Sequence, residues 1–198
     1  MKRSLVGLAL LLAITPAVAV ADAPTHAWAH KNGVVDLQNN GVHLDYDEPL
    51  QRQHVVEAMY RWGIAFDEGR IEVIRSLFTA DASYEVLKAS NVRLAAAQGR
   101  DAIVSSVESS IAQQGDQRRH LITNVVVDRF SPATARIVAY ALVALPGDPS
   151  IIGATVIYRG DLRRETDGVW RFTHLIIGED AYAGKPPVVP VDPTMKRP

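Results

Sequence analysis

Residues 117–128, "QRRHLITNVVVD", form the stretch on which the fold prediction depends. Ile122 and the three valines at 125–127 make it typical of a β-strand, because β-branched side chains favour an extended backbone. Residues four apart on a strand point to the same side of the sheet. We therefore expect His120 and Asn124 to share one face, with Ile122 between them, and this polar pair indicates a face that lines a cavity.

That stretch belongs to the first of four strand-like runs in the second half of the chain. The runs are RHLITNVVVDRF (119–130), ATARIVAYALVAL (133–145), IIGATVIYRGDLRRE (151–165) and GVWRFTHLIIG (168–178). Turn-forming residues separate them, and Asp167-Gly168 is a strong hairpin signal. One further strand is expected earlier in the chain, at TADASYEV (79–86).

Helical patterns precede the strands. Pro49 is suited to a first helical turn, and Val55, Met59, Trp62 and Phe66 follow it at helical spacing. Gly69 is suited to the end of that helix. A second helix is expected at 71–78 and a third at 99–114.

Helices followed by a run of strands predict an α+β fold. We expect a strongly curved, cone-like antiparallel sheet, covered on one face by the three helices and enclosing a pocket. We also expect one domain at 48–182. Before it, residues 24–47 form an N-terminal arm or a poorly ordered linker, and a proline-rich tail follows at 183–198.

The beginning of the chain predicts export. Lys2 and Arg3 precede an apolar run from Leu5 to Ile14 and then small residues, which is the layout of a secretory signal peptide over residues 1–23. An uncleaved anchor is the alternative. We expect a periplasmic or secreted protein with no membrane contact after cleavage, and cleavage follows Ala21 or Ala23.

Composition excludes several classes of function. The net charge of −1 gives no reason to expect nucleic acid as a partner, and the chain has no cysteine for a disulfide or a thiol nucleophile. No P-loop, dinucleotide-binding glycine motif, G-x-S-x-G or H-E-x-x-H sequence occurs. We therefore expect neither a cofactor nor a metal.

The runs YRWGIAFDEGRIEVIRSLFTADASYEV, GRDAIV, RHLITNVVVD, ATARIVAYAL and DGVWRF together resemble the SnoaL-like branch of the nuclear-transport-factor-2-like superfamily. This superfamily includes scytalone dehydratase, ketosteroid isomerase and polyketide cyclases. The resemblance extends over about residues 50 to 180. The resemblance implies the cone-shaped fold. Members of the superfamily often pair or trimerise through the exposed face of the sheet, so a homo-oligomer is a further possibility that the resemblance raises.

The resemblance also implies a site. Dehydratase-type members place an aspartate at the end of the first helix, matched by Asp67, opposite a histidine in an H-x-x-x-N pattern, matched by His120 and Asn124. Tyr84 lies two residues from the position of a strand tyrosine in those members, and Arg159 is near the place of an arginine on the third long strand. This chain departs from the pattern at Phe66, where a tyrosine is expected, and it lacks a second histidine in YALVAL.

The residues support the same pair without the family. Asp67 lies beside the apolar stripe of its helix and at a helix C-terminus, where the dipole disfavours an anion; the alternative is a solvent-exposed loop aspartate. His120 is a natural general base near neutral pH, and the alternative is a core histidine. His174, on an aromatic-lined strand, is a rival histidine.

Other side chains complete the predicted pocket. Tyr60 and Tyr84 are candidate donors to a carbonyl oxygen, although tyrosines in such positions are more often core residues. Trp62 and Phe66 are expected at the pocket wall, and Asn124 either orients a substrate or bonds to backbone.

We therefore predict a cofactor-free lyase or isomerase in which a His120–Asp67 dyad abstracts a proton from a small hydrophobic substrate. The alternative is a module of the same fold that binds a small molecule, or serves an assembly, without catalysis.

Overall fold

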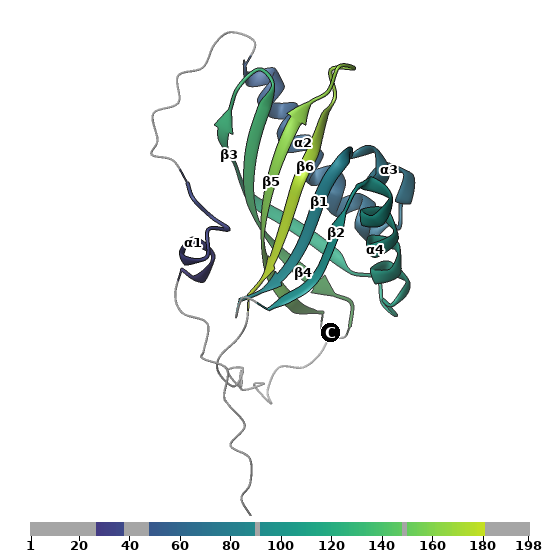
Figure 1. Cartoon of the computed structure of the whole chain (residues 1–198). Helices are drawn as coiled ribbons and strands as arrows, with labels where there is room; N and C mark the ends of the chain where they lie inside the picture. The colour runs from purple at the N-terminus through teal and green to yellow at the C-terminus, as the bar shows by residue number, and fades with distance from the viewer. Residues whose placement is uncertain (1–26, 38–47, 90–91, 148–149, 181–198) are drawn as a thin grey trace, which may run out of the picture.

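The computed structural model describes residues 27–37, 48–89, 92–147 and 150–180 (Figure 1). The predicted signal peptide and proline-rich tail lie outside these residues. Four helices precede or interrupt the strands: α1 (Trp28–Lys31), α2 (Glu48–Asp67), α3 (Ile71–Ser76) and α4 (Arg100–Ala112). The strands are β1 (Phe78–Lys88), β2 (Arg93–Gln98), β3 (Arg119–Phe130), β4 (Thr134–Leu145), β5 (Ile151–Arg164) and β6 (Trp170–Glu179).

The six strands form one sheet in the order β2-β1-β6-β5-β4-β3. The predicted α+β fold with a curved sheet is confirmed, but the sheet is mixed and not wholly antiparallel, because β1 and β6 run parallel. The parallel pair joins the early β1–β2 hairpin to the later meander. Strand β2 was not predicted, since its RLAAAQ sequence is rich in alanine, which strands disfavour.

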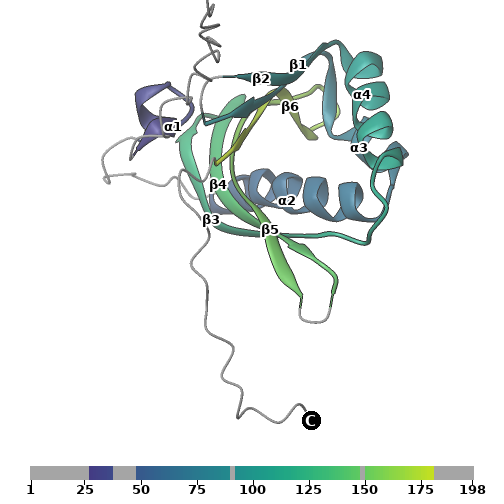
Figure 2. The same ribbon diagram turned by 90° about the horizontal axis from the view of Figure 1, so that it is seen from below.

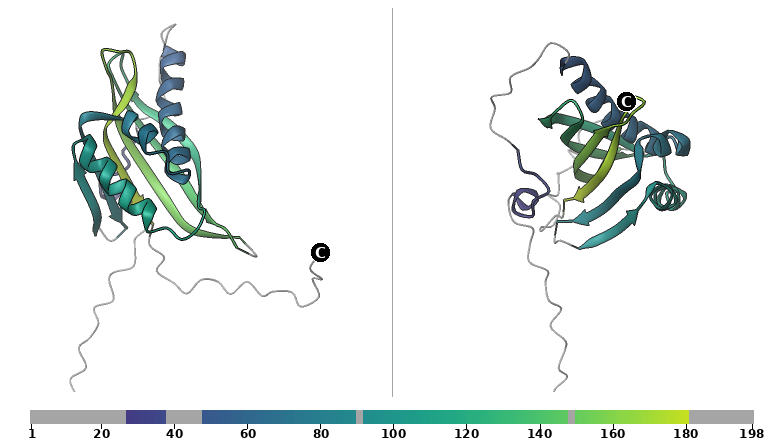
Figure 3. Two further views of the ribbon diagram at one scale, coloured as in Figure 1. Left: turned by 90° about the vertical axis from the view of Figure 1, so that its right-hand side faces the viewer. Right: turned by 45° about the horizontal axis from the view of Figure 1, so that its top comes forward.

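The sheet curves around α2, and α3 and α4 lie on the same side of it (Figure 2). Figure 3 shows from two further directions that these three helices occupy one side of the sheet. The main core fills the space between them, with Trp62, Phe78 and Phe172 among its largest buried side chains. None of the helices in the described residues is long and apolar enough to cross a membrane.

Glycines end two elements as the sequence predicts. Gly69, at φ 60°, follows α2, and the amide of Arg70 donates to the carbonyl of Ala65. Gly168, at φ 81°, turns the chain between β5 and β6.

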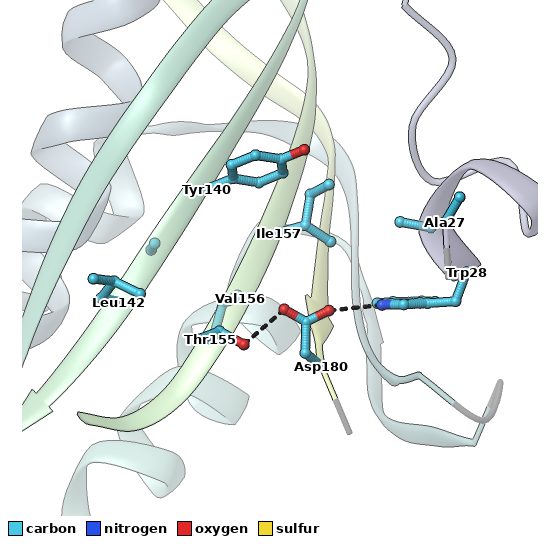
Figure 4. A pocket seen from close by; sticks show the side chains of 10 residues that line it. Ala27, Trp28, Tyr140, Leu142, Thr155, Val156, Ile157 and Asp180 are labelled. Carbon is cyan, nitrogen blue, oxygen red and sulfur yellow. Dashed lines mark hydrogen bonds between the residues drawn. The ribbon is translucent and has the colours of Figure 1, made fainter. Parts of the chain in front are cut away.

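Residues 27–37 of the expected N-terminal arm form helix α1 and the segment that follows it. Helix α1 packs on the outer face of the sheet, where Trp28 and Val34 cover Val138, Ile157 and other apolar residues. The Trp28 indole donates to Asp180 (Nε1 to Oδ1, 2.7 Å), which also accepts a hydrogen bond from Thr155 (Figure 4). This burial offsets the entropy of ordering the segment.

Candidate active site

The end of α2 lies directly against the start of β3. A Cβ on Gly63 would come within 2.8 Å of the Ile122 side chain, so glycine permits this close approach. The side chain of Gln117 donates to the backbone carbonyl of Asp67 (2.9 Å), and Arg119 pairs with Glu68. Together these contacts fix the carboxyl end of the helix beside the first residues of the strand.

At this junction Asp67 and His120 form two hydrogen bonds. The backbone amide of His120 donates to Oδ2 of Asp67 at 2.8 Å, and the ring Nδ1 lies 2.5 Å from Oδ1. Only 7% of the Asp67 side chain and 12% of the His120 side chain are exposed. Asp67 is therefore not a solvent-exposed loop aspartate, because its carboxylate is held inside the protein by the strand.

The geometry decides which ring nitrogen carries the proton in neutral His120. An ionised carboxylate only accepts hydrogen bonds, so Nδ1 must donate. Nε2 is then the unprotonated nitrogen, and it makes no hydrogen bond within the described part of the chain. The Phe66 ring packs edge-on against the imidazole at 5.2 Å between centroids and restricts its orientation.

His120 lines a cavity of about 160 Å³ between the helices and the sheet. Aromatic and aliphatic side chains form most of its wall, while Ser110 of α4 and, after that helix, Gln114 and Arg118 contribute polar side chains. The lining residues are Trp62, Phe66, Tyr84, Val86, Ser110, Gln114, Arg118, His120, Val143, Ala154, Val156, Tyr158, Ile177 and Glu179. The volume is close to that of an engineered cavity, about 150 Å³, that binds benzene.

Two tyrosines of this cavity are held in the neutral form. Burial raises the pKa of Tyr84, and the negative charge of Glu179 raises it further. Burial also raises the pKa of Tyr158, where Tyr84, Asp67 and Glu179 add to the rise and Trp62 opposes it. Both phenols are therefore hydrogen-bond donors at neutral pH and not phenolates.

Of the predicted pocket residues, Trp62, Phe66 and Tyr84 line the cavity with His120. Tyr60 does not line it: 41% of this residue is exposed, and it lies on the same side of α2 as Ile64, one helical turn away. Arg159 lies on the outer face of the sheet, where it donates to Asp161 (3.0 Å) and to the backbone of Gly33 (2.9 Å). Arg159 therefore holds α1 and its following loop rather than a substrate.

The predicted shared face of His120 and Asn124 is wrong because β3 contains a bulge. The strand register shifts between Thr123 and Val126, and Asn124 adopts φ 52°. One extra residue reverses the alternation of side chains. Asn124 is exposed, while Val125 takes the inward place and packs against the core.

A similar irregularity affects His174. The register of β5 and β6 shifts between Asp161 and Leu162, so His174 does not share the inward face of Phe172. Its Nε2 lies 3.5 Å from the carboxylate of Glu85 and outside the cavity. His174 is not a second histidine for this cavity.

Sequence reasoning missed Tyr158 and Glu179. Both lie on inward positions of long strands, and alternation from Val156 and from Ile177 would have found them. No group of three or more His, Asp or Glu side chains suited to a metal ion occurs within residues 27–37, 48–89, 92–147 and 150–180.

The chain matches the SnoaL-like domain family over residues 47–176 and belongs to it. This range covers α2 to most of β6 and includes both members of the Asp67–His120 pair. Among curated proteins no match was found.

Solved structures share the fold at low sequence identity. A protein of unknown function with a cystatin-like fold from Nostoc punctiforme has a TM-score of 0.56 and 14% identity, over 70% of this chain and 96% of that one. An NTF2-like protein from Novosphingobium aromaticivorans has a TM-score of 0.54 and 22% identity, over 68% and 90%. Aln2 from a Streptomyces species has a TM-score of 0.56 and 21% identity, over 66% and 91%.

Proposed function

We propose that this protein is a cofactor-free lyase or isomerase that removes a proton from a carbon next to a carbonyl group of a small hydrophobic molecule. The observation that supports this most strongly is the Asp67–His120 pair, in which Nδ1 is bound and Nε2 is left as the base at a cavity wall. A general base needs this combination of fixed tautomer and access to the substrate.

In the proposed step, Nε2 of His120 takes the proton and the electrons of the C–H bond pass to the carbonyl oxygen. Asp67 stabilises the imidazolium that forms, and Tyr84 or Tyr158 donates a hydrogen bond to the developing oxyanion. An isomerase returns the proton to a different carbon. In a lyase the carbonyl bond re-forms, a double bond is made to the next carbon, the leaving group departs from that carbon, and the imidazolium gives its proton to the leaving group.

The size and lining of the cavity support a substrate of about one ring. A volume of about 160 Å³ is below the range of roughly 300–1,000 Å³ usual for drug-sized ligands. The site we propose is therefore selective for small ring ketones or similar compounds. We further propose that the protein acts after export, in the periplasm or outside the cell, on the basis of residues 1–23.

A binding module without catalysis is the second candidate. The aromatic wall around His120 and the position of Phe66 favour it, because Phe66 supplies no donor where dehydratase-type relatives have a tyrosine. Both candidate functions place a ligand in the same cavity. They differ in whether the protein there catalyses exchange of the proton on the carbon next to the carbonyl group.

Deuterium incorporation separates the two without knowledge of the natural substrate. Cyclohexanone, 1-indanone and related ring ketones are incubated with the full chain in deuterated buffer, and label on the carbon next to the carbonyl is measured by NMR. We expect catalysed exchange that His120→Ala abolishes and His54→Ala, at an exposed position, leaves unchanged. Ligand binding with no catalysed exchange for any member of the panel favours the binding module.

A further inference from the structure

Glu179 is a charged side chain on the wall of the cavity that contains His120. It is the last residue of β6, two residues after Ile177, which points into the core. Its partner across the sheet, Val156, lines the same cavity. The alternation of the strand therefore directs the Glu179 carboxylate inward.

This carboxylate has no protein partner in the part of the chain that the structure describes. The other charged groups at the cavity are paired: Asp67 holds His120, and Arg118 donates to Asp116 at 2.8 Å. Lys88 lies beside Glu179 in the sheet, but it is exposed and forms no ion pair with it. The side chain of Glu179 makes neither a hydrogen bond nor an ion pair within the same residues.

Its charge nevertheless acts inside the cavity. The negative charge of Glu179 contributes to the raised pKa of both Tyr84 and Tyr158. The Glu179 side chain is only partly buried, and its carboxylate is open to water when the cavity is empty. A ligand that fills the cavity displaces this water and has to supply a donor in its place, because a carboxylate among aromatic and aliphatic side chains is costly without one.

We propose that Glu179 binds a hydrogen-bond-donating group of the substrate, an ammonium or a hydroxyl, and so fixes the substrate class. This inference rests on the proposed function in placing the ligand in the His120 cavity. The substrate is then a small ring compound with a carbonyl near His120 and a donor at its other end. A carboxylate at that end is excluded by repulsion from Glu179.

A charged donor suits the Glu179 carboxylate best. An ammonium forms a charge-assisted hydrogen bond with a carboxylate, and such bonds are roughly twice as strong as neutral ones. We therefore expect an ammonium to bind more tightly than a hydroxyl.

The test is an NMR titration of the full chain with three probes of one size: benzylamine, benzyl alcohol and benzoate. We expect benzylamine to shift signals of Ile177 and Val156, benzyl alcohol to bind more weakly, and benzoate not to bind. Equal affinity for benzylamine and benzoate in the unaltered protein would overturn the inference, and this comparison needs no variant.

Variants of Glu179 then distinguish the effect of its charge from the effect of its size and shape. Glu179→Gln should weaken benzylamine at least 10-fold while benzyl alcohol still binds, and Glu179→Leu should weaken both. Glu165→Gln, in an ion pair with Arg163 outside the cavity, is the matched control and should change neither. Unchanged benzylamine affinity in Glu179→Gln contradicts the proposal.

His120→Ala distinguishes failure of this inference from failure of the proposed chemistry. Benzylamine should still bind to that variant, because the ammonium contact does not need the base. One outcome is that benzylamine binds more tightly than benzyl alcohol and benzoate does not bind, while no ring ketone exchanges deuterium. In that case the proposed reaction is wrong, and the assignment of a donor-bearing ligand to Glu179 is kept. If exchange occurs but the three probes bind equally, the reaction stands and the role of Glu179 fails.

Discussion

Asp67, at the end of α2, holds His120, at the start of β3, by both its backbone amide and its ring Nδ1, at 2.8 and 2.5 Å. One carboxylate thus fixes the position of the strand and the tautomer of the neutral imidazole. Gly63 leaves room for the Ile122 side chain beside this contact, because a Cβ at that position would meet the Ile122 Cδ1 at 2.8 Å and force the side chain to shift.

The first prediction concerns the tautomer of His120. In ¹⁵N NMR spectra of neutral His120 we expect the Nδ1–H form, because Asp67 accepts that proton. Asp67→Asn removes this preference, since an amide can also donate. The Nε2–H tautomer in the unaltered protein would contradict the assignment of Nε2 as the base.

The second prediction concerns the donors to the oxyanion. Tyr84→Phe and Tyr158→Phe should each lower the deuterium-exchange rate, by up to about 10²-fold for the tyrosine that contacts the oxygen. Tyr140→Phe is the control, because Tyr140 is half exposed outside the cavity. If neither cavity variant loses more rate than Tyr140→Phe, the tyrosines only fill space.

The third prediction concerns the bulge at Asn124. Asparagine and glycine tolerate its φ of 52°, whereas a β-branched residue does not. Asn124→Gly should stay within about 0.5 kcal/mol of the unaltered free energy of unfolding, and Asn124→Val should lose about 1–3 kcal/mol. The deuterium-exchange rate should be unchanged in Asn124→Gly. A large loss of rate in this variant would show that Asn124 contributes to the active site.

The fourth prediction concerns the pH dependence of stability. Burial opposes ionisation of Asp161, but hydrogen bonds from Arg136 and Arg159 outweigh it and hold the pKa of this carboxyl below its usual value. A carboxyl with a lowered pKa stabilises the fold above its unfolded pKa of about 3.9, and this contribution is lost as the pH falls through the folded pKa.

Asp161→Asn should therefore lower the free energy of unfolding at pH 7, by about 1–3 kcal/mol. The difference from the unaltered protein should shrink below about pH 4. Urea denaturation at several pH values measures it, with Asp116→Asn as the control at a more exposed ion pair. A difference that stays constant down to pH 3 would show that the charge of Asp161 contributes nothing.

The sequence predicts the main helices and five of the six strands, because periodicity and turn residues are local signals. The Asp67–His120 pair joins distant segments, and it was predicted from the resemblance to dehydratase-type members. It does not reveal the parallel pairing of β1 with β6, which depends on a contact between distant segments. Strand β2 was not predicted because its alanines have little preference for strands.

The remaining errors in the site have one physical cause. Alternation predicts faces only while a strand is regular, and bulges reverse it near Asn124 and near His174. Tyr60 was assigned to the pocket as a candidate hydrogen-bond donor, and Arg159 by resemblance to an arginine of other members, but α2 and β5 turn both side chains outward. Tyr158 and Glu179 follow the regular alternation of their strands, so the sequence pattern could have predicted that both side chains point inward.

The most direct test of the account is the rate of deuterium incorporation by Asp67→Asn relative to the unaltered protein, with a ring ketone that the unaltered protein exchanges. The account predicts a loss on the order of 10²-fold or more, because the amide no longer fixes the tautomer or stabilises the imidazolium. An unchanged rate in a folded variant would show that Asp67 and His120 do not act together, and would contradict the central claim.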